Sequence, residues 1–247
     1  MKAEKEDKRI AADSTSQPVN QSTSQPAGPA AGILEYLRQQ DVDVMGVADM
    51  DRYGKEILGL GDGLSKEYPR AICFGMAVSR SVLDTLTDGP TIFYLHHYRQ
   101  INYRLDMISY LLGREIERRG FRALPIAASQ MVDWQDQKGH ISHKHVAVLA
   151  GLGWTGRNNL LVNPGFGAQL RYNSVLTDMP LEADAPLAFG CAQCHACVRV
   201  CPAGAIKEEP ADFDHKGCFA KLKAFKNERN LGQHICGICV KACGGHV

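Results

Sequence analysis

The spacing of hydrophobic residues predicts alternating helices and strands from residue 33 onward. Residues 33–37 place their apolar side chains on one face of a short helix, and residues 42–48 have the composition of a strand. Ala71–Val78 is a continuous apolar run of strand length, which predicts a buried strand. Over Ile101–Ile116, isoleucine and leucine recur at spacings of four, three, four and four, so we expect a long amphipathic helix that stops at Gly120.

The second half of the chain has a less regular pattern. Residues 124–128 return as a strand, and the apolar residues 145–150 fit either a helix or a strand. Residues 158–162 and 169–176 flank the turn-forming sequence Asn163–Gly167, which predicts a β-hairpin. Because helices and strands alternate without clean βαβ repeats, we predict an α+β fold.

Composition divides the chain into three predicted parts. Residues 1–30 are charged at first and then rich in Ser, Thr, Gln and Pro. Such a segment has too few large apolar side chains to offset the entropy of ordering it, so we predict a disordered tail. An α+β core is predicted at 31–185, and a cysteine-rich domain at 186–247.

Charge and hydropathy exclude several classes of protein. The 28 Lys and Arg residues almost balance the 27 Asp and Glu residues, and the net charge of +1 argues against a protein that coats nucleic acid. The uncharged apolar stretches are far shorter than the ~18–20 residues of a membrane-spanning helix. Residues 1–10 are charged and no apolar segment of a signal peptide follows them. We therefore expect a cytoplasmic protein without a membrane partner.

Eight of the nine cysteines lie in the last quarter of the chain, and their spacing is the strongest signal in the sequence. The run C-x2-C-x2-C-x3-C-P has the ferredoxin spacing, in which three thiolates bind one 4Fe–4S cluster and the fourth binds a neighbouring one. A further cysteine and the run C-x2-C-x3-C follow it. The count predicts two clusters, one held by Cys191, Cys194, Cys197 and Cys243, the other by Cys201, Cys218, Cys236 and Cys239.

The alternative to iron–sulfur clusters is a pair of zinc sites, because zinc also binds four thiolates. Zinc sites favour two separated Cys-x2-Cys pairs, whereas this chain packs four cysteines into eleven residues. The spacing therefore favours clusters. Cys73 lies in the predicted buried strand and is interpreted as a small apolar side chain, not a ligand.

A glycine motif lies just after the apolar residues 145–150. Gly151, Gly153 and Gly156 satisfy G-x-G-x-x-G, the pattern of a dinucleotide-binding loop. That loop must open a helix, whereas the turn-forming Asn163–Gly167 follows within a few residues and no βαβ unit comes after it. We do not expect a nicotinamide cofactor here. The glycines either form a structural turn or allow the backbone to approach a cofactor closely.

Three stretches of the chain resemble the epoxyqueuosine reductases and their shorter relatives: His143–Val162, Val175–Leu181 and the ferredoxin run. The same order of core and dicluster module is found in reductive dehalogenases. The resemblance covers about residues 32–243. It implies a nitroreductase-like core that binds a corrinoid, cobalamin, followed by a ferredoxin-like domain with two 4Fe–4S clusters. It also implies an oxidoreductase in which the clusters pass electrons to cobalt and then to an unknown substrate.

The resemblance also suggests residues of the active site. Val132-Asp133 matches the Val-Asp pair whose aspartate is the proposed proton donor of the family, although Asp133 can equally be a helix N-cap. Histidines near the pocket can likewise be structural. The cofactor-binding candidates are Tyr98, His140, His143, Gly151, Gly153, Trp154, Gly156 and Asn158.

The chain differs from full-length epoxyqueuosine reductases after the clusters, where those proteins continue into helical repeats that help to hold tRNA. Here only four residues follow Cys243. We therefore expect a small-molecule substrate or an electron-transfer partner, and tRNA is a doubtful substrate. The alternative function is a dicluster electron carrier or activator that donates electrons to a partner protein.

Overall fold

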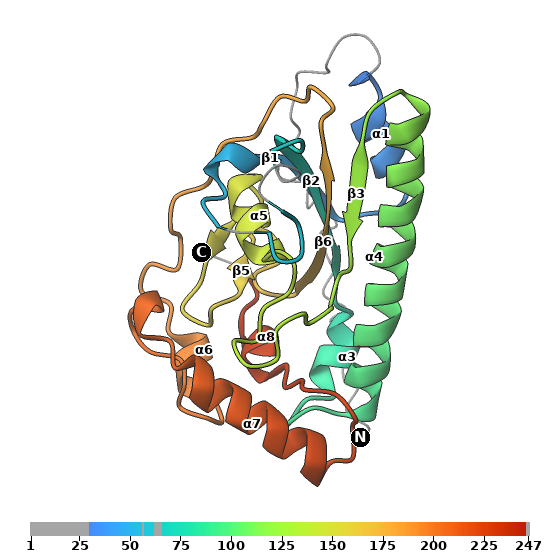
Figure 1. Ribbon diagram of the computed structural model, residues 1–247. Helices are drawn as coiled ribbons and strands as arrows, with labels where there is room; N and C mark the ends of the chain where they lie inside the picture. Colours follow the sequence, from blue (N-terminus) through green and yellow to red (C-terminus); the bar gives the residue numbers. More distant parts are fainter. Residues whose placement is uncertain (1–29, 56, 62–65, 246–247) are drawn as a thin grey trace, which may run out of the picture.

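The computed structural model describes residues 30–55, 57–61 and 66–245, arranged around a four-stranded antiparallel sheet (Figure 1). The strands are β1 (Val44–Asp49), β2 (Arg70–Ala77), β3 (Ala123–Ile126) and β6 (Leu170–Thr177), in the order β1-β2-β6-β3. The strands β2 and β6 are central, as expected for apolar runs that are buried on both faces. The predicted mixture of helices and strands is confirmed, and the predicted tail falls almost entirely outside the described residues.

Two helices cover opposite faces of the sheet. The long helix α4 (Ile92–Arg118) packs on one face, and α5 (His143–Leu149) packs on the other (Figure 1). Thr91 caps α4 by accepting a hydrogen bond from the Tyr94 amide, and Gly120 follows the last turn with φ of 88°. The periodic residues 101–116 face the sheet, so the predicted long amphipathic helix is confirmed, and it begins close to Pro90, where the turn Asp88-Gly89-Pro90 predicts its first turn.

The remaining elements are all shorter than α4, and most have two to six residues. They are α1 (Ile33–Arg38), η2 (Met50–Arg52), α3 (Arg80–Asp84), β4 (Trp154–Thr155), β5 (Leu161–Val162), α6 (Ala196–Val200), η3 (Pro210–Asp212), α7 (His215–Glu228) and α8 (Ile238–Ala242). None of the helices in the described ranges is long and apolar enough to cross a membrane.

The predicted hairpin around Asn163–Gly167 is wrong. The strand β6 pairs with β2 and β3 in the main sheet, while β5 pairs with β4 in a separate two-stranded ribbon. The turn itself forms, because the Asn163 side chain accepts hydrogen bonds from the amides of Gly165 and Phe166 and donates one to Leu152 O at 2.7 Å. The turn therefore redirects the chain from the ribbon into the sheet instead of joining two paired strands. All pairs in the main sheet are antiparallel, so the glycine motif does not lie in a βαβ unit.

The cysteine-rich segment packs against the core. Leu231, Ile235 and Ile238 join the same hydrophobic cluster as Ile33 and Leu105 from the first half of the chain. The two predicted domains thus share one apolar core across the proposed boundary at residue 185.

The edge of the sheet is open beside half of β6. The strand β3 pairs with β6 from Ala123 opposite Thr177 to Ile126 opposite Ser174, and the chain then leaves the sheet. The residues of β6 before Ser174 consequently have a strand neighbour, β2, on one side only. Charged and aromatic side chains lie at this uncovered edge.

Candidate functional site

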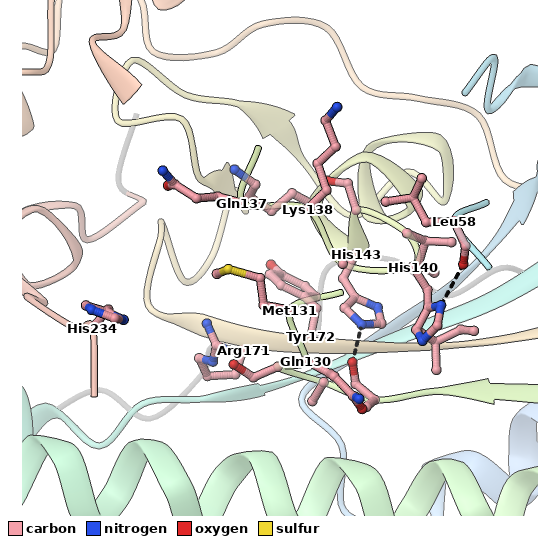
Figure 2. Close-up of a pocket in the computed structure, with 18 of the residues that line it drawn as sticks. Leu58, Gln130, Met131, Gln137, Lys138, His140, His143, Arg171, Tyr172 and His234 are labelled. Carbon is pink, nitrogen blue, oxygen red and sulfur yellow. Dashed lines mark hydrogen bonds between the residues drawn. The ribbon is translucent and has the colours of Figure 1, made fainter. Parts of the chain in front are cut away.

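A cavity of about 870 Å³ lies beyond the point where β3 leaves the sheet. Arg171 and Tyr172 on β6 form one wall with Tyr98 of α4, and residues 126–144 run around it. His234 reaches it from the cysteine-rich segment between α7 and α8. Figure 2 shows Arg171, Tyr172 and Met131 grouped in this space, with His234 on the far side. The cavity is therefore built jointly by the sheet core and the C-terminal segment.

The charged groups around the cavity are almost all positive. Lys55, Lys138, Lys144 and Arg171 line it, and none of the described lining residues is an aspartate or glutamate. Lys138 pairs with Asp136 at 2.7 Å outside the lining. The other three cations have no such carboxylate partner in the wall, so the cavity attracts a negatively charged group.

Arg171 lies over the ring of Tyr98, with its guanidinium carbon 4.2 Å from the ring centre. Asn102 accepts a hydrogen bond from Arg171 Nε at 3.2 Å and holds the guanidinium in place. Burial raises the pKa of the Tyr98 phenol, but the Arg171 charge and hydrogen bonds with Ser129 and Asn102 outweigh burial and lower this pKa below its usual value. A phenol with a lowered pKa is better suited to donate a proton.

Tyr172 presents a second phenol at the same wall. Its hydroxyl oxygen is fully buried and has no hydrogen-bond partner among the described residues. Burial, and then the neighbouring Cys73 thiol, raise the pKa of Tyr172 well above its ordinary value, so the phenol stays protonated. A buried hydroxyl without a partner costs about 1–3 kcal/mol. A ligand that accepts a hydrogen bond would remove that cost.

The predicted histidines line the cavity but are largely bound to the protein (Figure 2). His143 Nε2 contacts Ala127 O at 2.9 Å and Nδ1 contacts Ser174 Oγ at 3.0 Å. Burial lowers the pKa of His143 to about 4, so the ring is neutral, Nε2 donates and Nδ1 accepts. His140 Nδ1 contacts Leu58 O at 2.6 Å. Both rings therefore fix the loop that surrounds the cavity.

Asp133 lies in a tight turn next to the cavity and is not part of its lining. Its Oδ1 accepts hydrogen bonds from the amides of Gln135 at 2.9 Å and Asp136 at 3.0 Å, and its backbone pairs with Lys138. This geometry is a side-chain cap of the turn at residues 133–138. In this arrangement the Asp133 carboxylate is directed to its own backbone.

The predicted residues of the glycine-rich segment lie outside the cavity, where they join the sheet core to the cysteines. A Cβ at Gly151 would lie 2.7 Å from Ala185 O, and one at Gly153 would collide with Val162 O. A Cβ at Gly156 would lie 3.6 Å from Cys191 Sγ. The glycines therefore allow close backbone packing, and Gly156 allows it beside a predicted cluster ligand. Trp154 and Asn158 are in the same segment.

Arg157 was missed by the sequence reasoning, although it is the only charged residue between Lys144 and Arg171. It is 8% exposed, and its guanidinium donates hydrogen bonds to Glu208 O at 2.6 Å, Ala192 O at 3.0 Å and Cys194 O at 3.2 Å. Its isolation in an apolar, glycine-rich stretch could have indicated a structural role, because a buried cation requires hydrogen-bond partners. Arg157 fastens the loop that carries the first two cysteines.

The eight C-terminal cysteines are free thiols. We call Cys191, Cys194, Cys197 and Cys243 the first cysteine group, and Cys201, Cys218, Cys236 and Cys239 the second. Burial raises the pKa of Cys197 to about 11, with further contributions from Cys243, Cys191 and Cys194. Burial likewise raises the pKa of Cys218 to about 11, with contributions from Cys201 and Cys236. Burial, and then Cys236, Cys218, Cys197 and Cys201, raise the pKa of Cys239, so thiols of both groups influence it. The division of the eight thiols into two sets of four ligands stays a prediction.

The donor set fits iron–sulfur clusters. No three His, Cys, Asp or Glu side chains in the described residues gather tightly enough to hold a single metal ion. A cubane is held by thiolates at separate corners, and cysteine thiols are the donors that such clusters take. Cys73 is fully buried in β2, where burial raises the pKa of its thiol to about 12, consistent with a packing role.

The cavity fits a large cofactor that carries an anionic group and hydrogen-bond acceptors, by its volume, its cations and the unpaired Tyr172 hydroxyl. Its lining also offers the aromatic rings of Tyr53, Tyr98 and Trp134, which suit contact with a flat macrocycle.

The described fold is similar to the folds of solved reductive dehalogenases and epoxyqueuosine reductases. A reductive dehalogenase structure, described with a mechanism for B12-dependent dehalogenation, matches with a TM-score of 0.69 at 20% identity, covering 92% of this chain and 33% of that one. The epoxyqueuosine reductase from Bacillus subtilis, described with its catalytic loop swung out of the active site, matches with a TM-score of 0.53 at 19% identity, covering 85% and 63%.

Curated epoxyqueuosine reductases also match this chain in sequence, which confirms the resemblance that the sequence analysis predicted. The enzyme of Escherichia coli (strain K12) is 40% identical over 82 residues, which are 33% of this chain and 21% of the relative. The enzyme of Synechococcus sp. (strain CC9605) is 31% identical over 157 residues, which are 60% of this chain and 45% of the relative. The chain thus covers less than half of each relative. No family model matches it.

Proposed function

We propose that this protein is an iron–sulfur oxidoreductase that passes electrons from two 4Fe–4S clusters, through a corrinoid, to a substrate in the cavity at β6. The observation that carries the proposal is the position of the second cysteine group. Gln233 and His234 line the cavity, and they lie three and two residues before Cys236 of that group. Electrons that reach this group are therefore next to the cavity.

The two groups differ in their access to solvent. The first group includes the exposed Cys194 and the buried Cys197, whereas all four cysteines of the second group are half-buried and Cys236 packs against the core cluster that contains Tyr94. We propose that electrons enter at the first cluster and leave from the second. This order uses the exposed cluster for contact with a donor and the inner cluster for delivery.

The chemistry that a corrinoid supplies when bound is reduction of an organic substrate at cobalt. The residues of this chain would bind the anionic groups, exclude water and provide a proton. Tyr98 Oη is suited to hold that proton, because Arg171 stabilises the phenolate that remains after transfer. Tyr172 Oη is suited to orient a bound acceptor.

Asp133 stays in the proposal as a second proton donor. Its carboxylate would have to leave the turn and enter the cavity, which requires movement of the loop at residues 130–139. The Bacillus subtilis relative is described with its catalytic loop swung out of the active site, which supports a comparable movement here. Asp133 and Tyr98 are distinguishable by mutation, because they lie on different elements.

The substrate we propose carries a negative charge, such as a carboxylate or phosphate, because Lys55, Lys144 and Arg171 line the described cavity wall and no carboxylate does. One solved epoxyqueuosine reductase is described with a tRNA stem loop, a polyanion. For this chain we expect a small-molecule substrate, and tRNA stays a doubtful one.

Anaerobic reconstitution followed by iron and sulfide analysis tests the clusters. We expect about eight irons and eight sulfides per chain, as two cubanes require. Cys197→Ala should remove one cluster, and Cys73→Ala, as the matched control, should remove none. Zinc in place of iron, or equal iron in both variants, contradicts the assignment.

A titration with cob(II)alamin, followed by visible and electron paramagnetic resonance spectra, tests the corrinoid site. We expect saturable binding that is weakened by Arg171→Gln. Full cluster loading without cobalamin binding would refute the corrinoid step and favour the alternative function, a dicluster electron carrier for a partner protein.

A further inference from the structure

The ribbon that joins the sheet core to the cysteines places a hydrogen-bond donor on a cluster ligand. Trp154 Nε1–H donates to Cys191 Sγ at 3.2 Å. The indole is 7% exposed, and a Cβ at Gly190 would lie 2.7 Å from its far edge, so the ring is held between the ribbon and the cysteine loop. This contact is fixed by packing and does not depend on a flexible side chain.

A second buried donor lies on a residue near the same cysteine. Asn158 is 4% exposed, and its Oδ1 accepts a hydrogen bond from the Leu160 amide at 3.2 Å, which orients the carboxamide. Its Nδ2 is buried and has no hydrogen-bond partner among the described residues. A Cβ at Gly156 would lie 3.0 Å from Asn158 Oδ1 and 3.6 Å from Cys191 Sγ, so Asn158 and Cys191 both adjoin Gly156. A sulfur atom of a bound cluster is an acceptor that would satisfy this buried amide.

The position of Arg157 between these two residues adds a positive charge. Its guanidinium is buried and bonded to the backbone of the loop from Cys191 to Cys194. Trp154, Arg157 and Asn158 thus bring two N–H donors and a cation to one side of the first cysteine group.

We propose that Trp154 and Asn158 are positioning residues that donate hydrogen bonds to the sulfur atoms of the first cluster and raise its reduction potential. The inference rests on the proposed function, because it requires that the cluster is bound. Reduction adds negative charge to the cluster, so N–H donors stabilise the reduced form more than the oxidised form. The Arg157 charge acts in the same direction.

The test is a redox titration of the anaerobically loaded protein, followed by electron paramagnetic resonance. Trp154→Phe keeps an aromatic ring and removes the donor. We expect the reduction equilibrium constant of the first cluster to fall about tenfold, which is 59 mV for a one-electron couple. The second cluster is an internal reference and should keep its potential. Asn158→Asp, which keeps the oxygen acceptor and removes the amide donor, should shift the first cluster in the same direction.

The chain offers a matched control, because it has only two tryptophans and the other, Trp134, is 63% exposed on the cavity loop. Trp134→Phe should leave both cluster potentials unchanged. Unaltered potentials in fully loaded Trp154→Phe and Asn158→Asp would overturn the inference. A wild-type chain that binds no iron would instead overturn the proposed function on which the inference rests.

A measurement on the wild-type chain covers the case in which Trp154→Phe does not load. Protein labelled with ¹⁵N at the indole nitrogen and then reduced should show a ¹⁵N hyperfine coupling to the first cluster. The coupling should persist in Trp134→Phe. Absence of the coupling in the loaded wild-type protein would overturn the role of Trp154.

Discussion

Arg157 offers a quantitative test of how the sheet core holds the cysteine loop. Arg157→Met keeps the length of the side chain and removes three charge-assisted hydrogen bonds to Ala192 O, Cys194 O and Glu208 O. Each such bond contributes about 1.5–3 kcal/mol. The three accepting residues are exposed, so water replaces part of the loss, and we expect the free energy of unfolding to fall by about 2–4 kcal/mol.

The assay is urea unfolding of the metal-free, reduced chain, which isolates the protein contacts from cluster binding. Arg157→Lys keeps the charge but lacks the planar fork, and should recover about half of the loss. Arg199→Met on α6 is the matched control, because Arg199 is exposed, and it should change stability by less than about 0.5 kcal/mol. Equal stability of Arg157→Met and wild type would refute the reasoning.

Three further predictions address the cavity and the ribbon. Asp133→Asn preserves the turn, because Asn also accepts the two amide hydrogen bonds. A 10²–10⁴-fold loss of substrate reduction, with clusters and corrinoid retained, would establish that Asp133 is a proton donor. Turnover at the wild-type rate would exclude that role. Because the folded pKa of His143 is about 4 and that of a free imidazole about 6.5, the unfolded chain binds more protons between these values. Stability should therefore fall by about 3 kcal/mol as the pH drops from about 6.5 to 4, and His143→Gln should show a smaller fall in pH-dependent unfolding. In the same assay, Gly153→Ala should lower the free energy of unfolding by at least about 2 kcal/mol, because the added Cβ would collide with Val162 O. Gly61→Ala is the control and should be nearly neutral, because Gly61 has open space around it. Equal effects of the two substitutions would contradict the packing argument.

The elements that the sequence predicted well are those whose pattern is local. The spacing of Ile101–Ile116 describes one face of α4 without reference to any other segment. The strand β6 was also recognised, but its partner was not, because β6 pairs with β2 about a hundred residues earlier. Short-range turn signals at Asn163–Gly167 favoured a hairpin, and the long-range pairing of two buried strands prevailed over it.

The candidate site was predictable only in part for the same reason. The cysteine spacing predicts two sets of ligands from a local pattern, and that assignment stays a prediction. The cations at Lys55 and Arg171 are separated by more than a hundred residues, and nothing in their local sequence indicates a common cavity. Val132-Asp133 was recognised by resemblance, but a two-residue pair does not reveal that the carboxylate caps its own turn.

The apolar core shared by Ile33, Leu105, Leu231 and Ile238 has a consequence for how the protein is made. Residues 231–238 follow the sheet and α4 in the sequence, so these elements cannot bury their common face until the cysteine-rich segment has also been synthesised. The same segment carries Cys236 of the second cysteine group. On the proposed function, cluster binding and closure of the core would involve the same segment, and a shortage of iron should lower the amount of folded protein in the cell before it limits turnover.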